Sequence, residues 1–292
     1  MNRMPMPSTG PTASRDADAL LTEVGRLDSV VVAYSGGVDS ALVLAASLRA
    51  LGPSRTLAAT ADSPALARDE LLLARRTAAE LGVELVVLTT DELAVPGYRA
   101  NAGDRCYFCK RTVLAAVSDL AAARGYAHVA TGTHRDDHRS GHRPGLRAAR
   151  ERGVVEPLAG AGLGKAQVRA VARKWGLAVA DKPGTPCLAS RIAVGLPVTR
   201  LRLELVERAE SAVRKFLAER HAPVRDLRVR ILAGAFRLEL DATAHGWLAG
   251  RPEQEAELLD RIGRTVGLAD GTLGPYLPGS VNGVATAWGG RR

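Results

Sequence analysis

A buried strand, a glycine turn and a helix follow one another without a break in residues 29–51. The apolar run SVVVAY predicts the strand, SGG predicts the turn, and residues 40–51 predict the helix. Glycines in such a turn let the backbone approach an anion closely, amide N–H groups point at it, and the helix dipole adds positive potential. The segment therefore predicts a phosphate-binding loop in an α/β fold, with a glycine turn that binds nothing as the alternative.

Apolar runs and amphipathic stretches continue to alternate after this segment. The predicted strands are 29–34, 56–60, 84–89 and 127–132, and the predicted helices are 40–51, 65–82, 109–124 and 164–176. This alternation indicates a parallel sheet with right-handed crossovers, in which ligands bind beyond the carboxyl ends of the strands. We therefore expect the glycine turn to lie at the ligand-binding edge of the sheet.

The pattern changes after Pro197. A long amphipathic helix is predicted over 200–220, followed by RDLRVRIL and FRLELD, which alternate with period two, and by a last helix at 253–265. A chain of 292 residues is long enough for about two domains. The predicted organisation is a disordered tail over 1–15, an α/β domain over 16–196, a smaller α+β domain over 197–266 and a Gly-rich extension over 267–292.

The composition limits the classes of partner that the chain could bind. The chain has 40 lysines and arginines against 31 acidic residues, which favours an anionic partner. It has only 4% aromatic residues, so few stacking platforms for single-stranded nucleic acid. No apolar run approaches the roughly 20 residues that span a bilayer, and the N-terminal region lacks the apolar core of a signal peptide. By itself the charge fits nucleotides, phosphorylated metabolites and nucleic acid alike. With few stacking platforms we expect no nucleic acid, and we expect no membrane and a cytoplasmic location.

Polar residues in the glycine turn extend the phosphate-loop prediction. The predicted ligand-binding residues are Ser35, Gly36, Gly37 and Ser40. Asp39 would repel a phosphate, so its expected role is to hold a Mg²⁺ ion that bridges phosphate oxygens. The loop is not a Walker loop, and the only similar segment, GAGLGKA around Lys165, has the wrong glycine spacing and no hydroxyl after the lysine.

The chain has three cysteines, an odd and low number that argues against a disulfide framework. Cys106 and Cys109 form a C-x-x-C pair, which zinc often uses, but a structural zinc site needs four ligands. One of the six histidines would have to complete it, and three of them, His134, His138 and His142, lie in one loop. A second interpretation of the C-x-x-C pair is a redox-active pair just before a helix, but this interpretation leaves Cys187 unexplained. Prolines around Cys187 predict a constrained loop, with a buried apolar cysteine as the alternative.

Several motifs together resemble a known family. SGGVDS resembles the signature of the ATP-pyrophosphatase (PP-loop) superfamily, which implies a flavodoxin-like parallel sheet, cleavage of ATP between the α and β phosphates, and Thr60 and Asp62 near the adenosine. With ADSP, RCYFCK, RPG and PCLASR in this order, residues from about 20 to 245 resemble the ATP-dependent sacrificial sulfur transferases of the LarE type. A tRNA thiolase or amide-forming PP-loop enzyme, and a nucleotide-binding sensor without enzymatic activity, are the rival interpretations.

The resemblance implies a reaction. The family builds the nickel-pincer nucleotide cofactor of lactate racemase by adenylating the carboxylates of pyridinium-3,5-biscarboxylic acid mononucleotide and replacing oxygen with sulfur. In members with one cysteine, the residue matching Cys187 attacks the acyl adenylate and loses its sulfur by β-elimination. In members with the C-x-x-C pair, the residues matching Cys106, Cys109 and Cys187 hold a 4Fe-4S cluster with one open iron. Having all three cysteines and no others, the chain fits the cluster variant better, and both stay open.

Four charged residues complete the expected site. Arg228 and Arg230 project from one strand face, where paired guanidinium groups suit a phosphate. The resemblance implies that they hold the phosphate of the substrate, whereas the residues alone favour a solvated strand face. Arg191 and Glu210 are expected in the same substrate pocket. The expected cofactors are ATP, Mg²⁺ and a 4Fe-4S cluster, the expected partner is a small-molecule nucleotide, and we expect a homo-oligomer.

Overall fold

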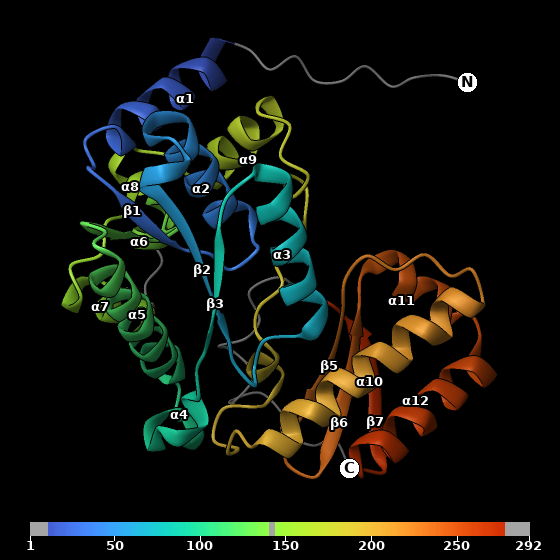
Figure 1. Ribbon diagram of the computed structural model, residues 1–292. Helices are drawn as coiled ribbons and strands as arrows, with labels where there is room; N and C mark the ends of the chain where they lie inside the picture. Colours follow the sequence, from blue (N-terminus) through green and yellow to red (C-terminus); the bar gives the residue numbers. More distant parts are fainter. Residues whose placement is uncertain (1–10, 140–143, 278–292) are drawn as a thin grey trace. The chain divides into compact units, whose positions relative to one another are not determined.

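The computed structural model describes residues 11–139 and 144–277, which fall into two compact units (Figure 1). The first unit comprises the chain up to Ser63, Arg68–Thr90 and Cys106–Gly184, and the second comprises Pro64–Ala67, Asp91–Arg105 and the chain from Thr185 onward. The division therefore differs from a single boundary near Pro197. The reason is that the segment around Cys187 pairs with the second unit: Ala193 N–H donates to the carbonyl of Ile231 at 3.0 Å.

The first unit contains a parallel sheet, as the sequence predicts. Its strands are β1 (Val30–Ala33), β2 (Thr56–Asp62), β3 (Leu85–Thr89) and β4 (His128–Ala130), in the order β3-β2-β1-β4. The strand order reverses at β1, because β2 lies on one side of it and β4 on the other. The crevice beyond the carboxyl end of β1 is therefore the expected ligand position, and the glycine turn begins there.

Helices cover both faces of this sheet. They are α1 (Pro11–Val24), α2 (Val38–Leu51), α3 (Arg68–Leu81), α5 (Arg105–Arg124), α6 (Arg135–Arg139), α7 (Pro144–Glu151), α8 (Pro157–Gly160) and α9 (Lys165–Lys174), with a short 3-10 turn η1 (Pro53–Arg55). Val30 and Val32 pack in the cluster formed with α1, α2 and α9, whereas Val31 packs with Val117 and Ala121 of α5. Burial on both faces explains why the strands are continuously apolar.

Two helix boundaries differ from the sequence-based expectation. The tail expected over 1–15 is helical from Pro11, because Ala17, Leu20 and Val24 recur at helical spacing and are buried. Residues 1–10 lie outside the described residues. Helix α5 begins at Arg105 rather than at 109, so Cys106 and Cys109 lie inside its first turns and not before it.

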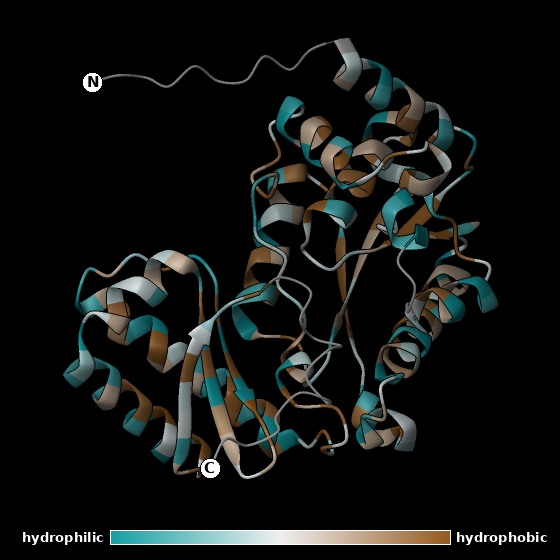
Figure 2. Cartoon of the chain, turned by 180° about the vertical axis from the view of Figure 1, so that it is seen from behind, coloured by the Kyte–Doolittle hydropathy of each residue, from teal (hydrophilic) through white to brown (hydrophobic). Residues whose placement is uncertain are grey.

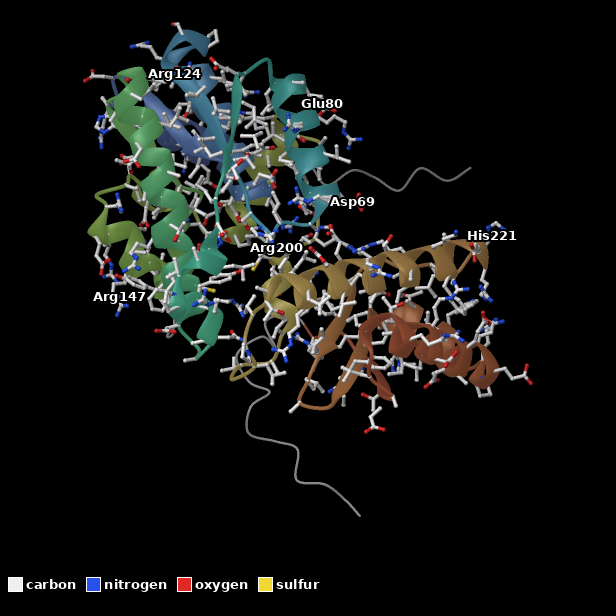
Figure 3. All side chains as sticks on the ribbon, turned by 60° about the horizontal axis from the view of Figure 1, so that its bottom comes forward. Asp69, Glu80, Arg124, Arg147, Arg200 and His221 are labelled. Atoms are coloured by element: carbon white, nitrogen blue, oxygen red, sulfur yellow. The ribbon has the colours of Figure 1, made fainter. Side chains whose placement is uncertain are left out.

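The second unit is a smaller α+β unit. Its sheet has the order β5-β6-β7, with β5 (Leu227–Ile231) antiparallel to β6 (Ala235–Leu240) and β7 (Asp270–Pro275) parallel to β6. Its helical segments are η2 (Glu92–Ala94), α4 (Pro96–Ala100), η3 (Leu188–Arg191), α10 (Arg200–Glu219), α11 (Ala242–Ala249) and α12 (Pro252–Val266). Figure 3 shows α10 running from Arg200 to the labelled His221, just beyond its end. Figure 2 shows the helices alternating between hydrophobic and hydrophilic stretches, as expected of helices that rest one face on a core.

The Gly-rich extension expected over 267–292 contains strand β7, so the expectation of no regular structure is wrong for this part. Residues 270–275 pair with the whole of β6, and 278–292 lie outside the described residues. A Cβ atom at Gly271 would collide with the ring of Phe236, so the glycine permits close packing here instead of marking an unstructured segment. Among the described residues, no helix is long and apolar enough to cross a membrane.

Candidate active site

The predicted phosphate loop joins β1 to α2. Gly36 has a φ of +71°, a conformation that strains any other residue, and a Cβ atom there would lie 3.3 Å from the Cβ of Ala74. The hydroxyl of Ser40 fixes the turn, because it accepts from the Ser35 N–H at 3.1 Å and donates to the Gly37 carbonyl at 3.2 Å. Gly37 precedes the helix and offers no capping side chain, so the first amides of α2 are left for another acceptor. This is a suitable place for an anion.

Asp39, the expected magnesium ligand, is paired with Lys165. The Nζ atom of Lys165 lies 2.6 Å from both carboxylate oxygens of Asp39. This lysine was not among the predicted site residues, because its segment, GAGLGKA, resembles only an imperfect Walker loop. A usable signal was present, because Lys165 opens the helix α9 of the same parallel-sheet domain.

The residues that follow β4 contact the first turns of two helices, α2 and α9. A Cβ atom on Gly132, just after β4, would lie 2.6 Å from the Ser40 amide nitrogen, so only glycine fits this crossing. Asp136 accepts a hydrogen bond of 2.7 Å from the Lys165 N–H. That bond lowers the pKa of Asp136 below its ordinary value, with smaller contributions from Arg135 and His134 and with burial acting in the opposite direction.

The residues expected near the adenosine lie at the end of β2. Thr60 donates its hydroxyl to the carbonyl of Tyr34 at 2.7 Å, which ties β2 to the residue before the phosphate loop. Burial raises the pKa of Tyr34 to about 12, so this phenol is neutral under physiological conditions. The carboxylate of Asp62 accepts from Arg68 at 2.7 Å. Contact of Thr60 and Asp62 with adenosine stays a prediction.

Lys182 connects the phosphate loop with the segment that leads to Cys187. Its Nζ atom donates to the carbonyl of Gly36 at 3.2 Å and also forms an ion pair with Glu70 of α3. The lysine side chain is 14% exposed, and it contacts the turn that is expected to hold phosphate. The DKPG segment is therefore anchored directly to the backbone of the glycine turn.

Cys106 and Cys109 lie on one face of α5, because residues three apart are neighbours on a helix. Cys106 is exposed and Cys109 is half-buried, and no disulfide joins any cysteines in the described residues, which include all three. Burial lowers the pKa of the adjacent Lys110, and the charges of Cys109, Glu156 and Asp137 oppose that shift.

Neither metal interpretation of the cysteines, zinc or cluster, gains support from the described part of the chain. There, no group of three or more His, Cys, Asp or Glu side chains is arranged to hold a metal ion. His134 lies 3.4 Å from Asp137, and His138 lies 2.7 Å from Glu156. His142 lies outside the described residues. The cluster-binding role of the three cysteines stays a prediction, with Cys106 and Cys109 in the first unit and Cys187 in the second.

Cys187 is exposed, which contradicts the alternative of a buried apolar cysteine. It precedes the 3-10 turn η3, and its carbonyl accepts from the Ser190 N–H at 2.9 Å. The neighbouring Leu188 N–H donates to the carbonyl of Ala65 at 2.9 Å. The backbone on the C-terminal side of Cys187 is therefore fixed, while its side chain reaches solvent.

Arg191 holds this turn from inside. Its guanidinium group donates to the two carboxylate oxygens of Glu210 at 2.8 and 3.2 Å, and to the carbonyl of Cys187 at 3.2 Å. It also donates to the carbonyl of Pro186 and to the hydroxyl of Ser190. Arg191 and Glu210 were expected to bind substrate, and the structure places both in an internal network with side-chain exposures of 2% and 3%.

Arg228 and Arg230 are buried, so the solvated strand face is wrong. Arg230 pairs with Glu239 at 2.7 Å and donates to the carbonyl of Ser190 at 3.2 Å. Arg228 donates to the hydroxyl of Tyr276 at 2.8 Å, and its guanidinium carbon lies 4.6 Å from the centre of that ring. Tyr276 was not among the predicted site residues, because it lies in the segment expected to be a Gly-rich extension.

The second unit therefore gathers Cys187, Arg191, Glu210 and Arg230 in one hydrogen-bonded group. Glu210 joins helix α10 to strand β5, because its carboxylate also accepts from the Val229 N–H at 3.1 Å. Ser190 joins η3 to the same strand through Arg230. An exposed thiol stands on a turn that is held by two buried arginines and their carboxylate partners.

Comparisons with known proteins found relatives that are similar in sequence to this chain. No protein-family model matches it. It is 42% identical over 191 residues to an uncharacterized protein of Synechocystis sp., covering 65% of this chain and 70% of the relative. It is 33% identical over 221 residues to the pyridinium-3,5-bisthiocarboxylic acid mononucleotide synthase of Lactiplantibacillus plantarum, covering 76% and 78%. At this identity and over more than two thirds of both chains, the likeness shows that the chain belongs to the family of pyridinium-3,5-bisthiocarboxylic acid mononucleotide synthases.

Proposed function

We propose that this protein is an ATP-dependent sulfur transferase. It adenylates the carboxylates of pyridinium-3,5-biscarboxylic acid mononucleotide and converts them to thiocarboxylates for nickel-pincer nucleotide cofactor biosynthesis. The support is a relative named for the bisthiocarboxylic acid mononucleotide. The single observation that carries the proposal is the exposed thiol of Cys187 on a turn fixed by the buried Arg191.

In the adenylation step, the loop from Ser35 to Ser40 binds the phosphates of ATP. The amides at the start of α2 and the Ser35 hydroxyl offer donors for the phosphate oxygens. Asp39 suits a cation, because both of its oxygens already contact the Lys165 ammonium group at 2.6 Å. Mg²⁺ bound there would neutralise phosphate charge. The substrate carboxylate then attacks the α phosphorus, the bond to the bridging oxygen breaks, and pyrophosphate leaves with the electron pair.

In the sulfur-transfer step, Cys187 is the proposed sulfur donor. Its thiolate attacks the acyl carbon, AMP leaves, and a thioester to the protein forms. Removal of the Cα proton then breaks the Cβ–S bond, so the sulfur departs as a thiocarboxylate and dehydroalanine remains at position 187. In the cluster variant, Cys106, Cys109 and Cys187 would hold a 4Fe-4S cluster that supplies sulfur at its open iron. Three thiols fit that group in number and kind.

The covalent chain itself supports the coupling of the two steps. Lys182 contacts the phosphate loop, and Cys187 follows five positions later. An extended segment of that length spans at most about 18 Å between Cα atoms. The chain therefore limits how far the thiol can lie from the lysine that anchors the glycine turn.

The proposal is tested by incubating the purified protein with the dicarboxylate mononucleotide, ATP and Mg²⁺. Release of pyrophosphate together with a thiolated mononucleotide in the product mass spectrum is expected. Pyrophosphate release that does not depend on the mononucleotide, or a product without sulfur, contradicts the proposal. A homo-oligomeric state and a cytoplasmic location remain predictions.

A further inference from the structure

Lys182 is held by several elements of the first unit. Its Nζ atom donates to the carbonyl of Gly36 at 3.2 Å and forms an ion pair with Glu70 of α3, and the two paired side chains are 14% and 18% exposed. An ion pair so far removed from water adds little net stability, because desolvation offsets the attraction. The backbone of the lysine is fixed separately, because Arg169 of α9 donates to the carbonyls of Ala180 at 2.7 Å and Lys182 at 2.9 Å. A firmly placed residue therefore makes the contact with the glycine turn.

The contact between Lys182 and the Gly36 carbonyl fixes the direction of the next amide. The peptide between Gly36 and Gly37 is trans and therefore planar, so the Gly36 carbonyl and the Gly37 N–H point in opposite directions. The Gly37 N–H accordingly points away from the lysine, and Gly37 is the residue that precedes α2. The two ends of this one peptide thus face the lysine and the start of the helix where an anion is expected.

An anion on the glycine loop would strengthen the lysine contact. Hydrogen bonds at the two ends of one peptide reinforce each other, because each bond polarises the group between them. A phosphate oxygen that accepts from the Gly37 N–H would make the Gly36 carbonyl a stronger acceptor for the ammonium group of Lys182. Occupancy of the loop by phosphate would therefore tighten the hold on Lys182.

A short connection leads from Lys182 to the exposed thiol of Cys187. Only residues 183–186 separate the two, and Pro183 and Pro186 are among them. Proline fixes its own φ and restricts the residue before it, so this connection has few backbone conformations. The chain leaves the first unit after Gly184, within the same connection. A change in how Lys182 is held is therefore passed along the chain to Cys187.

We propose that Lys182 is a positioning residue through which a phosphate on the glycine loop controls the reactivity of the Cys187 thiol. The inference rests on the proposed function, because it needs a nucleotide at the loop. It adds an order of events to that function: the thiol is set in place only when the nucleotide that activates the substrate carboxylate is bound. Lys182 touches neither nucleotide nor substrate in this role, and it acts through Gly36 and the covalent chain.

The test measures how fast iodoacetamide alkylates Cys187, with and without α,β-methylene-ATP and Mg²⁺. Mass spectrometry of the peptide that carries Cys187 separates this thiol from Cys106 and Cys109. Each protein receives the analogue at a concentration well above its own measured Kd. In the wild type, the analogue is expected to change the alkylation rate by about fivefold or more, which is the lower end of typical coupling between two sites.

Lys182→Met removes the contact with Gly36, so the ratio of its two alkylation rates is expected to be close to one. Arg173→Met is the matched control, because Arg173 pairs on the surface with Asp181, the neighbour of Lys182, and it is expected to keep the wild-type ratio. Circular dichroism shows whether the variants are folded. If Lys182→Met is not, Glu70→Gln replaces it, because it leaves the lysine without its counter-charge, and a ratio closer to one than in the wild type is again expected.

The same ratio in the wild type and in Lys182→Met overturns the inference, because the nucleotide then affects the thiol directly and not through the lysine. A wild type that binds the analogue but keeps its alkylation rate also overturns it, and so does a control variant that loses the ratio. A wild type that does not bind the analogue contradicts the proposed function itself, which separates that failure from a failure of the role assigned to Lys182.

Discussion

The guanidinium group of Arg191 donates to the carboxylate of Glu210 at 2.8 Å while both side chains are almost completely buried. The same guanidinium holds the carbonyl of Cys187. This arginine therefore links the stability of the second unit to the position of the proposed sulfur donor. Burying the two charges costs desolvation free energy that can offset their attraction, so the intact pair adds little net stability. Removing one partner, however, leaves the other charge buried without a counter-charge, which is strongly destabilising.

Glu210→Gln tests this link. The substitution leaves the Arg191 charge buried without its counter-charge, which is expected to lower the free energy of unfolding by about 3–5 kcal/mol. Urea denaturation followed by circular dichroism measures the change. Glu219→Gln is the matched control on the same helix, because its ion pairs with Lys215 and Arg220 are more exposed, and it is expected to change stability by less than about 1 kcal/mol. Equal effects of the two variants would contradict the assigned role.

Asp241 is expected to make the stability of the second unit depend on pH. Burial acts to raise the pKa of Asp241, but four backbone N–H groups, of Arg225, Asp226, Thr243 and Ala244, hold it below its ordinary value. Because the folded pKa is depressed, the stabilisation is present above the unfolded pKa of about 4 and is lost as the pH falls through the folded value.

Asp241→Ala removes the acceptor for all four groups. At pH 7 it is expected to lower the free energy of unfolding by about 1–2 kcal/mol, the usual cost of a lost N-cap. The difference from the wild type should shrink as the pH is lowered below about 4. Urea titrations at pH 7 and at low pH check this, and a difference that is constant with pH would show that the charge of Asp241 is not involved.

The two sulfur sources predict different appearances of the protein. In the cluster variant, anaerobic reconstitution with iron and sulfide is expected to give brown protein, and Cys106→Ala is expected to lose the colour because one of three cluster ligands is missing. Absorption spectroscopy measures this. A wild type that stays colourless contradicts the cluster variant. The sacrificial variant then predicts loss of hydrogen sulfide at Cys187 after turnover in the intact mass spectrum.

The sequence predicts those features that depend on local pattern. The apolar residues of β1, the turn at Gly36 and the alternation of strands and helices are all visible along the chain, and the structure has them at the expected positions. The two buried arginines of β5 were expected to share a strand face, but not to be buried, because their partners Glu239 and Tyr276 come from other strands and segments.

The missed features depend on long-range contacts. Lys165 and Asp39 are 126 positions apart, so no local pattern relates them. Strand β7 was missed because Gly271 reads as a loop residue, whereas its function is to make room for Phe236. The segment of Cys187 was assigned to the first domain by sequence order, although Ile192 bridges to Ile231 of the second unit.

Cys187→Ala removes the residue that both proposed sulfur sources require. The variant is expected to bind ATP as the wild type does, since Cys187 is not part of the phosphate loop, and to form no thiolated mononucleotide. Mass spectrometry of the small-molecule products, with the dicarboxylate mononucleotide, ATP and Mg²⁺ present, makes the measurement. The wild-type product is expected to contain sulfur, and the product of the variant is expected to contain none. A thiolated product from Cys187→Ala would contradict the assignment of Cys187 to sulfur transfer.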